Sequence, residues 1–213
     1  GNDYAETLGM AYSVPTAVTE ILRFQTVRAD VGRVNGRYFA ETLSFGLDAA
    51  IALDTMDRRQ KSGRAGTMLY LESAVDQLFH HLQVFSFKMD VLGAEPGCAP
   101  HPEWDDAYLV AVQVGPTYGG HFRITPKARL DDGLLDICWA TPELSSMRAL
   151  ALLLRARGGK HTGSDHIHFR RASSLVLDFE EEPPAQMDGE PVRGTHFVID
   201  CVPDALTVVV GQR

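Results

Sequence analysis

Two acidic residues near the end of the sequence, Asp188 and Glu190, are spaced to act on one substrate. They flank a glycine, and residues two apart lie on the same face of an extended chain. A carboxylate next to a substrate hydroxyl can accept its proton during group transfer. The Asp-Gly pair is equally typical of a hairpin turn. The residues alone therefore support a general base and a turn about evenly.

A second acidic segment, residues 130–136 with the sequence LDDGLLD, has the ligand chemistry of a metal site. The carboxylate of Asp132 and nearby backbone carbonyls are hard oxygen donors, which suit Mg²⁺ or Ca²⁺. Asp132 and Gly133 also suit a tight turn that starts the next strand. Because Asp-Gly turns are common, we favour the turn on the residues alone.

Histidines and glycines give weaker signals. His166 and His168 share a strand face and, with His161 nearby, could hold a transition metal. No cysteine or acidic residue completes a known spacing, so a surface-facing pair is favoured. The glycines of residues 115–120 could let the backbone approach a ligand, although a wide turn is favoured there as well.

The elements that must position these residues are mostly strands. Residues 27–32 alternate apolar and polar, and Asn35-Gly36 is a strong hairpin signal. Pro15 is a helix start, and residues 93–106, with three prolines and two glycines, predict a long loop. Further strands are expected at residues 83–91, 107–114, 134–140, 166–170, 174–179, 196–201 and 205–210, and further helices at residues 47–56, 65–82 and 144–154. This pattern predicts an antiparallel β-sandwich or distorted barrel.

Composition and charge narrow the classes of function. The chain has 213 residues, 45% of them hydrophobic, and a formal net charge of −8. Its longest mostly apolar run, residues 149–154, is far shorter than the roughly 20 residues that cross a bilayer. An acidic chain is poorly suited to bulk nucleic-acid binding, so no nucleic-acid partner is expected. Three widely spaced cysteines fit no zinc motif and predict reduced thiols in a cytoplasmic protein.

The order of these motifs resembles that of bacterial soluble diacylglycerol kinases and related lipid kinases. Residues 1–5, Gly-Asn-Asp-Tyr-Ala, are similar to the end of that family's Gly-Thr-Gly-Asn-Asp-Phe-Ala-Arg signature. Residues 31–36 and 44–49 are similar to its Asp-Leu-Gly-Arg-Val-Asn and Ser-Ile-Gly-Phe-Asp-Ala segments. Later matches follow in the family order at residues 118–120, 126–128, 130–136, 159–161 and 188–190. The likeness covers essentially the whole chain.

The resemblance implies a two-domain enzyme with a lipid cleft between an α/β domain and a β-sandwich. The α/β domain would bind the phosphates of ATP through a Gly-Gly-Asp-Gly-Thr loop, which is absent from this sequence. We therefore expect residues 1–25 to be the C-terminal helices of the upstream α/β ATP-binding domain. Residues 26–203 would be the β-sandwich lipid-kinase domain, and residues 204–213 a C-terminal strand that returns to the first domain. The expected fold class is mostly β (α+β).

The first residues also bear on the length of the natural protein. The chain opens at Gly1 in a polar turn, without a methionine, and Asn2 or Asp3 can cap a short helix that follows. We expect the natural polypeptide to continue upstream. By the resemblance, Asn2 and Asp3 would face the nucleotide, and Asp188 or Glu190 would be the general base on the lipid hydroxyl, with no choice between the two from the residues.

For the metal, the resemblance implies a structural Mg²⁺ bound by the carboxylate of Asp132 and by the backbone carbonyls of Arg129 and Leu134. Two departures affect the cleft. Residues 115–117 are Gly-Pro-Thr where the family usually has Asn-Gly or a similar polar pair, and His121 stands where a third glycine is common. Both departures are expected to reshape the headgroup site.

The implied activity is transfer of phosphate from ATP, with Mg²⁺, to the hydroxyl of diacylglycerol or a related lipid, and this segment alone would be inactive. Two alternatives stay open: a non-catalytic sandwich that binds a lipid or a partner, and a kinase of the same fold with a soluble substrate such as a dinucleotide. A pocket lined by Leu, Phe and Met would favour lipid, and one lined by Arg and Lys a soluble anion.

The expected location is cytoplasmic and peripheral to the inner membrane, where the lipid substrate lies. Two segments could contact the membrane: the loop of residues 93–106, which contains Trp104, and the basic linker of residues 58–64. A homodimer is left open.

Overall fold

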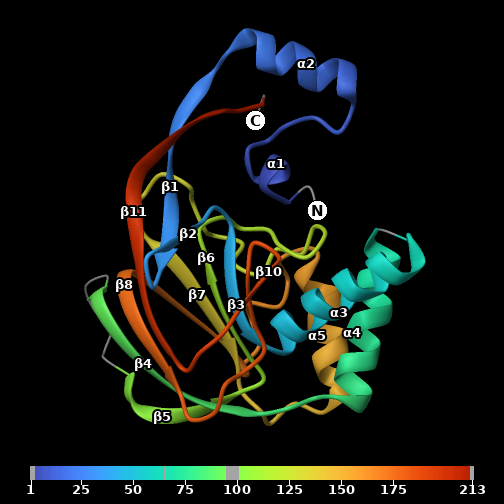
Figure 1. Ribbon diagram of the computed structural model, residues 1–213, viewed down its shortest axis with the longest axis vertical. Coiled ribbons are helices and arrows are strands. Elements are labelled where there is room, and N and C mark those ends of the chain that lie inside the picture. Colours follow the sequence, from blue (N-terminus) through green and yellow to red (C-terminus); the bar gives the residue numbers. More distant parts are fainter. Residues whose placement is uncertain (1–2, 65, 95–100, 212–213) are drawn as a thin grey trace.

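A computed structural model describes residues 3–64, 66–94 and 101–211 and places an antiparallel sheet of 11 strands at the centre of the molecule (Figure 1). The strands are β1 (Thr26–Val34), β2 (Arg37–Phe39), β3 (Thr42–Gly46), β4 (Phe85–Ala94), β5 (His101–Ala107), β6 (Leu109–Gln113), β7 (Leu135–Ala140), β8 (Ile167–Phe179), β9 (Ala185–Met187), β10 (Glu190–Val192) and β11 (His196–Val209). The helices are α1 (Asp3–Thr7), α2 (Val14–Arg23), α3 (Leu47–Ser62), α4 (Thr67–His80) and α5 (Ser146–Ala156). The mostly β class predicted from the sequence is confirmed.

The long strand β8 folds this sheet into two layers. Strand order is β10-β9-β3-β6-β7-β8-β11-β1-β2, and β4 branches from β8 with β5 beside it. The first part of β8, up to Ala172, pairs with β7, whereas its second part lies between β11 and β4. A strand that changes partners in this way forms the corner between two packed sheets. The expected β-sandwich is therefore present, with β8 shared by both layers.

Aromatic side chains fill the space between the layers. The ring of Phe45 on β3 lies 4.9 Å from the ring of Phe179 on β8 and 4.7 Å from that of Phe197 on β11, measured between centres. All three are buried. Full burial of such a side chain contributes roughly 1.5–3 kcal/mol. These contacts join strands that are far apart in the sequence.

Helices α3, α4 and α5 form a layer on one side of the sheet (Figure 1). Helix α3 begins directly after β3 at Gly46, where φ is +76° and a Cβ atom would lie 2.4 Å from the carbonyl oxygen of Tyr108. Only glycine satisfies both conditions. A second core, which includes Ile51 of α3, Tyr70 of α4 and Phe122, fixes the helices on the sheet.

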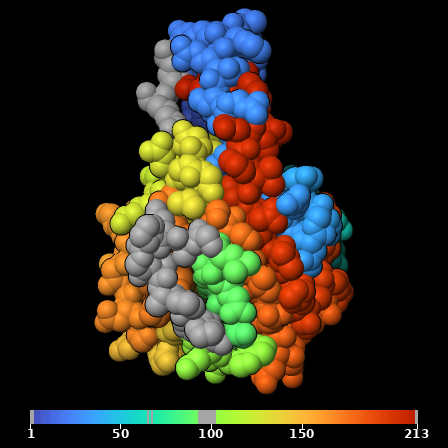
Figure 2. Space-filling view, turned by 90° about the vertical axis from the view of Figure 1, so that its left-hand side faces the viewer, coloured from blue at the N-terminus to red at the C-terminus, as the bar shows by residue number. Residues whose placement is uncertain are grey.

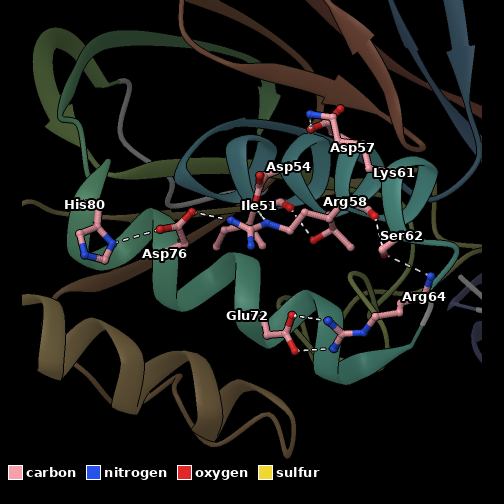
Figure 3. Close-up of polar contacts among 11 residues, drawn as sticks. Ile51, Asp54, Asp57, Arg58, Lys61, Ser62, Arg64, Glu72, Asp76 and His80 are labelled. Carbon is pink, nitrogen blue, oxygen red and sulfur yellow. Dashed lines mark hydrogen bonds and ion pairs between the residues drawn. The ribbon is translucent and has the colours of Figure 1, made fainter.

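The expectation of a basic linker at residues 58–64 is wrong, because α3 continues to Ser62. Acidic residues pair with the basic side chains and favour the helix: Arg58 contacts Asp54 four residues earlier and Asp76 on α4 (Figure 3). Lys61 with Asp57, and Arg64 with Glu72, form further pairs. These charges are partly neutralised, so this segment is a weaker membrane contact than its sequence suggests.

The long loop expected at residues 93–106 is also wrong at both ends. Strand β4 continues to Ala94 and β5 begins at His101, and the two pair antiparallel. Residues 95–100 lie outside the described part. In the described sheet β5 pairs only with β4, and an edge strand tolerates a proline because one side of its backbone needs no partner. The proline at position 102 therefore did not exclude a strand.

Helix α2 stands apart from the sandwich, whereas α1 contacts it through Asp3 and Thr7. Helix α2 lies at the top of Figure 1, and Figure 2 shows this end as a projection narrower than the body below it. A two-stranded ribbon leads to it, in which Thr26 at the start of β1 pairs with Val209 at the end of β11. The strands expected at residues 196–201 and 205–210 are thus one strand, β11.

A buried carboxylate, Asp30, fixes the irregular point of this ribbon. The pairing of β1 with β11 shifts register between Ala29 and Val31, and Asp30 at the shift is only 2% exposed. Its carboxylate accepts hydrogen bonds from the N–H of Asp204 at 2.9 Å and from the N–H of Gly133 at 2.7 Å. One side chain thus satisfies two backbone donors and joins the ribbon to the loop before β7.

We predict that Asp30→Ala lowers the free energy of unfolding by at least about 2 kcal/mol, because two backbone donors lose their acceptor at about 1–3 kcal/mol each. Urea denaturation followed by circular dichroism measures the change. Asp131→Ala is the control, since the side chain of Asp131 is 48% exposed and surface changes usually stay within about 0.5 kcal/mol. Equal stability of the two variants would contradict the role of Asp30.

Candidate functional site

Asp188 lies at the tip of the β9–β10 hairpin, beside the start of β3. Asp188 and Gly189 have φ values of +49° and +92°, as in the two-residue turns that suit the twist of a hairpin. The Asp188 carboxylate accepts hydrogen bonds from the backbone N–H groups of Ala40 at 2.6 Å, Glu41 at 3.1 Å and Thr42 at 2.9 Å. The predicted turn is present, and it fixes the carboxylate at the point where β3 begins.

The second acidic residue of this segment, Glu190, is the exposed first residue of β10. Among the described residues its carboxylate has no hydrogen-bond or ion-pair partner. Its backbone pairs with Met187. Both residues are exposed, and their contacts distinguish them: the Asp188 carboxylate is held by three backbone N–H groups, whereas that of Glu190 has no such partner among the described residues.

Asp3 on α1 is bound to the end of the glycine-rich segment, for which the sequence favoured a wide turn over a ligand-binding loop. Its carboxylate accepts hydrogen bonds from the N–H groups of Gly120 at 3.0 Å and His121 at 2.9 Å. The imidazole of His121 contacts the carboxylate of Glu6. Asn2, the other residue expected to face the nucleotide, lies outside the described residues. The segment that contains Asp3 and the segment of residues 118–121 are thus brought together beside α1.

A buried carboxyl that sequence reasoning missed, Glu41, lies between α1 and β3. It is 6% exposed, and one of its oxygens, Oε1, accepts a hydrogen bond from the hydroxyl of Thr7 at 2.7 Å. The Thr7 hydroxyl in turn lies 2.9 Å from that of Thr117. The other oxygen, Oε2, has no partner among the described residues. A Cβ atom on Gly115 would lie 2.3 Å from Glu41 Oε1, so glycine at position 115 makes room for this carboxyl.

Burial raises the pKa of the Glu41 carboxyl to about 8, and the negative charges of Asp188 and Asp3 add to the effect. Burial likewise raises the pKa of Tyr4, to which the charges of Glu41 and Asp188 also contribute. These interactions place Asp188, Asp3 and Glu41 in one electrostatic neighbourhood. A glutamate at this position gives no pattern in the sequence, since its partners come from residues 34 and 74–76 positions away.

The loop of residues 130–134 holds Asp132 through two contacts. Its carboxylate accepts a hydrogen bond from the N–H of Leu134 at 3.1 Å and forms an ion pair with Arg171. Arg171 also reaches Asp136 at 3.4 Å. The side chain of Arg129 pairs with Asp131. The expected metal ligand of Arg129 is its backbone carbonyl, which takes no part in this ion pair.

The oxygen donors of this loop fit Mg²⁺, because a carboxylate and two backbone carbonyls are hard ligands. Arg171 competes for the same carboxylate, and it also pairs with Asp136, which does not belong to the proposed ligand set. In the described part of the chain, no group of three or more His, Cys, Asp or Glu side chains could hold a metal. The predicted site uses one carboxylate, so that finding does not bear on it.

The three histidines do not gather into a metal site. The ring of His168 stacks on Trp139 with centres 5.2 Å apart. His161 is buried, and its Nε2 lies 2.9 Å from the carbonyl oxygen of Ile124. His166 lies 3.9 Å from Glu143. The sequence favoured a surface-facing pair over a metal site. His166 and His168 are half-buried, and His168 is packed on an aromatic ring.

The helical layer covers an apolar cavity of about 70 Å³ between α3, α4, α5 and strands β6 and β7. Its walls are mostly aliphatic and include Leu47, Ile51, Leu78, Leu109, Leu152 and Ile167. Two polar side chains, Asp48 and His161, also line it. Asp48 Oδ2 and His161 Nδ1 have no hydrogen-bond partner among the described residues. Burial raises the pKa of Asp48 to about 7 and lowers that of His161, so both are pushed toward their neutral forms.

A second cavity, of about 310 Å³, lies between α1 and residues 115–131. It is polar and contains charges of both signs, since Arg123 and Arg129 line it together with Glu6 and Asp131. Arg129 is paired with Asp131 at 3.2 Å. The cavity therefore lacks the uniform positive lining that would favour a soluble anion.

The chain is similar to known proteins of one family. Residues 41–210 match the family described as YegS C-terminal NAD kinase beta sandwich-like domain. A protein of Pectobacterium atrosepticum named probable lipid kinase YegS-like is 27% identical over 212 residues, which are 96% of this chain and 64% of that protein. A protein of Pseudomonas aeruginosa with the same name is 27% identical over 210 residues, or 97% of this chain and 64% of that protein. This chain thus spans just under two thirds of these curated relatives.

Solved structures share the fold. One described as a diacylglycerol kinase from Bacillus anthracis str. Sterne has a TM-score of 0.70 and 20% sequence identity. The match covers 99% of this chain and 63% of that one. The likeness extends over α1, α2 and the sandwich alike.

We predict that Glu41→Gln changes how stability depends on pH. The folded chain prefers the neutral carboxyl, so the contribution of Glu41 is complete below about pH 4.5 and is lost as pH rises toward 8. Glutamine keeps the shape and the contact with Thr7 but does not ionise. The variant should therefore gain stability relative to the parent across this window, on the order of 1.4 kcal/mol per pH unit.

Thermal and urea unfolding between pH 5 and about 8 measures the difference. Glu181→Gln, at an exposed position, is the control and should follow the parent at every pH. A constant offset between Glu41→Gln and the parent would contradict the assignment of a titrating buried carboxyl.

Proposed function

The chain belongs to the family of YegS C-terminal NAD kinase beta sandwich-like domains, and on that premise we propose that it is the lipid-side part of an ATP-dependent lipid kinase. Its membership bears out the resemblance to lipid kinases seen in the sequence. The relatives are named lipid kinases, and the solved structure is described as a diacylglycerol kinase. The proposed reaction transfers the γ-phosphoryl group of ATP to the hydroxyl of diacylglycerol or a related lipid.

The apolar cavity under the helices is the observation that carries this proposal. Aliphatic side chains from α3, α4, α5 and the sheet line it, and its volume of about 70 Å³ suits the end of a hydrocarbon chain. The alternative of a soluble substrate such as a dinucleotide is supported by the polar cavity beside α1, with its two arginines. Since that cavity also contains Glu6 and Asp131, we favour lipid.

We propose Asp188 as the general base on the lipid hydroxyl. It is favoured over Glu190 because its carboxylate is fixed at the start of β3 and lies near Asp3 and Glu41, whereas the Glu190 carboxylate has no hydrogen-bond partner among the described residues. The Asp188 carboxylate would accept the hydroxyl proton while the oxygen attacks the γ-phosphorus in line. Its three backbone hydrogen bonds fix its position for this step.

Residues 1–25 are proposed to belong to the ATP-binding domain, with Asp3 toward the nucleotide. Helix α2 and the residue that follows it support this proposal because they expose large apolar side chains: Val14 is 74%, Leu22 is 79% and Phe24 is 73% exposed. Contiguous apolar surface of this kind usually contacts another part of a protein. Residues 204–213 would return to that domain along the ribbon with β1.

At the loop of residues 130–134, Asp132 and the carbonyls of Arg129 and Leu134 would hold Mg²⁺. The ion would neutralise the Asp132 carboxylate and hold the loop in shape. Because Asp132 and Asp188 lie on different elements and share no contact, the proposed role of this ion is structural rather than catalytic. No helix of the described residues is long and apolar enough to cross a membrane.

We predict that Asp188→Asn in the full-length protein lowers kcat for diacylglycerol by 10²-fold or more, because the amide cannot accept the proton. A labelled-ATP transfer assay in mixed micelles measures turnover, and melting temperature checks that the variant is folded. Glu190→Gln is the matched control and should stay within a few-fold of the parent. Normal turnover by Asp188→Asn would remove the assignment, and turnover with NAD but not with diacylglycerol would favour the soluble substrate.

We also predict that Mg²⁺ raises the melting temperature of the chain through Asp132. Asp132→Ala should abolish the increase. Arg171→Gln should enlarge it, because the competing guanidinium is gone while the carboxylate remains. Melts of the three proteins with and without MgCl₂, with CaCl₂ as a second ion, measure the increments. An increment that is the same in all three would show that Asp132 serves only the turn.

A further inference from the structure

Helix α5 has two faces with different surroundings. Its inner face, with Leu152, Leu153 and Ala156, lines the apolar cavity. Its outer face is solvent-exposed and still carries large apolar side chains: Met147 is 66% and Leu154 is 48% exposed. Residues 147, 151 and 154 are spaced by four and three, so they form one stripe along the helix. A helix that is apolar on both faces needs a partner on the outer one.

Basic residues border this stripe on both sides. At 100° per residue, Arg148 and Arg155 lie on one side of Leu154 and Arg157 on the other. All three arginines are exposed. Arg157 also lies over the ring of Phe122, with its guanidinium carbon 6.0 Å from the ring centre, a contact that leaves its charge in place.

The charge on this segment is opposite to that of the whole chain. Residues 144–164 contain four Lys and Arg and no Asp or Glu, although the formal net charge of the chain is −8. Among the described residues, none of these four has an acidic side chain within 4.0 Å. By contrast, Arg58 and Lys61 of α3, and Arg64 just after it, are each paired with an acidic residue (Figure 3).

We infer that the outer face of α5 docks on a membrane surface that contains anionic lipids. An apolar stripe between arginines is the pattern of a helix that lies in the interface of a bilayer. The stripe enters the boundary of the acyl chains, and the long arginine side chains reach back to the phosphates. Each arginine near an anionic surface adds attraction, which the acidic remainder of the chain does not supply.

Docking of α5 would place the apolar cavity directly beneath the bilayer surface. The same helix separates the two, since its inner residues line the cavity. This consequence rests on the proposed function, in which the cavity takes the hydrocarbon part of a lipid. The docking surface itself requires only the stripe, the arginines and an anionic membrane.

Vesicle co-sedimentation of the full-length protein tests the docking. With phosphatidylcholine vesicles that include phosphatidylglycerol, the parent should bind, and added salt should weaken binding because surface charges are screened. The double variant Arg148→Gln/Arg155→Gln should bind at least tenfold more weakly, at about fivefold for each arginine. Met147→Gln/Leu154→Gln should weaken binding by a similar factor, through lost apolar contact.

Matched controls lie elsewhere on the surface. Arg193→Gln removes an arginine whose side chain is 89% exposed, and Tyr38→Gln removes an aromatic residue that is 59% exposed. Both should bind like the parent. Equal binding by the α5 variants and the controls would overturn the proposal. So would a parent dimer that the α5 variants convert to monomer without any change in vesicle binding, since a second copy would then be the partner.

The assay with mixed micelles separates this inference from the proposed function. Variants of α5 that lose phosphorylation on vesicles but keep it in micelles support both. Loss of vesicle binding by the α5 variants, in a protein that phosphorylates no lipid in either form, supports the docking surface and overturns the kinase.

Discussion

The hydrogen bonds between the Asp188 carboxylate and the start of β3 are the contacts on which the candidate site depends. A short side chain in a left-handed turn satisfies three successive N–H groups, those of residues 40–42. The hairpin tip and β3 therefore move as one unit. Because β3 runs directly into α3 at Gly46, the same contact also sets where the helical layer sits on the sheet. The proposed base and the apolar cavity thus share one support.

Two buried acids mark the ends of β3. Glu41 precedes the strand and Asp48 follows it, and burial raises the pKa of the first to about 8 and of the second to about 7. Each has one oxygen without a partner among the described residues. A buried polar atom left unpaired costs about 1–3 kcal/mol, and such atoms in a folded protein call for an explanation. At both residues the raised pKa is the explanation, because a neutral carboxyl with one unpaired oxygen costs far less than a buried charge.

The sequence predicted the sandwich because alternation and turn residues act locally. Asp188-Gly189 formed the turn expected of that pair, and the order of short motifs was sufficient for the lipid-kinase resemblance. The prediction of a linker at residues 58–64 was wrong. The Ser-Gly pair there indicates a break in the helix, but i,i+4 ion pairs such as that of Lys61 with Asp57 favour a longer helix. The prediction of a loop over residues 93–106 was wrong at both ends, because an edge strand such as β5 tolerates a proline.

Other features lie beyond local patterns. The burial of Glu41 arises from contacts with Thr7 and Gly115, which the chain brings together only after folding. The sequence of α5 shows its arginines, but not which of its apolar residues face the cavity and which face solvent. Only the packed structure separates Leu153, inside, from Leu154, outside. The charge of a surface can be counted from the sequence, whereas its pairing cannot.

The geometry of β3 gives the lipid-side proposal a direction. Its five residues span about 15 Å at roughly 3.3 Å per residue, with Asp188 beside one end and the cavity beyond the other. An acyl chain spans such a distance, so one diacylglycerol molecule would be long enough to offer its hydroxyl to Asp188 and the end of its hydrocarbon chain to the cavity. Length alone does not separate a lipid from an extended dinucleotide. The aliphatic lining of the cavity, in contrast to the mixed charges of the polar cavity beside α1, is therefore the feature that favours lipid.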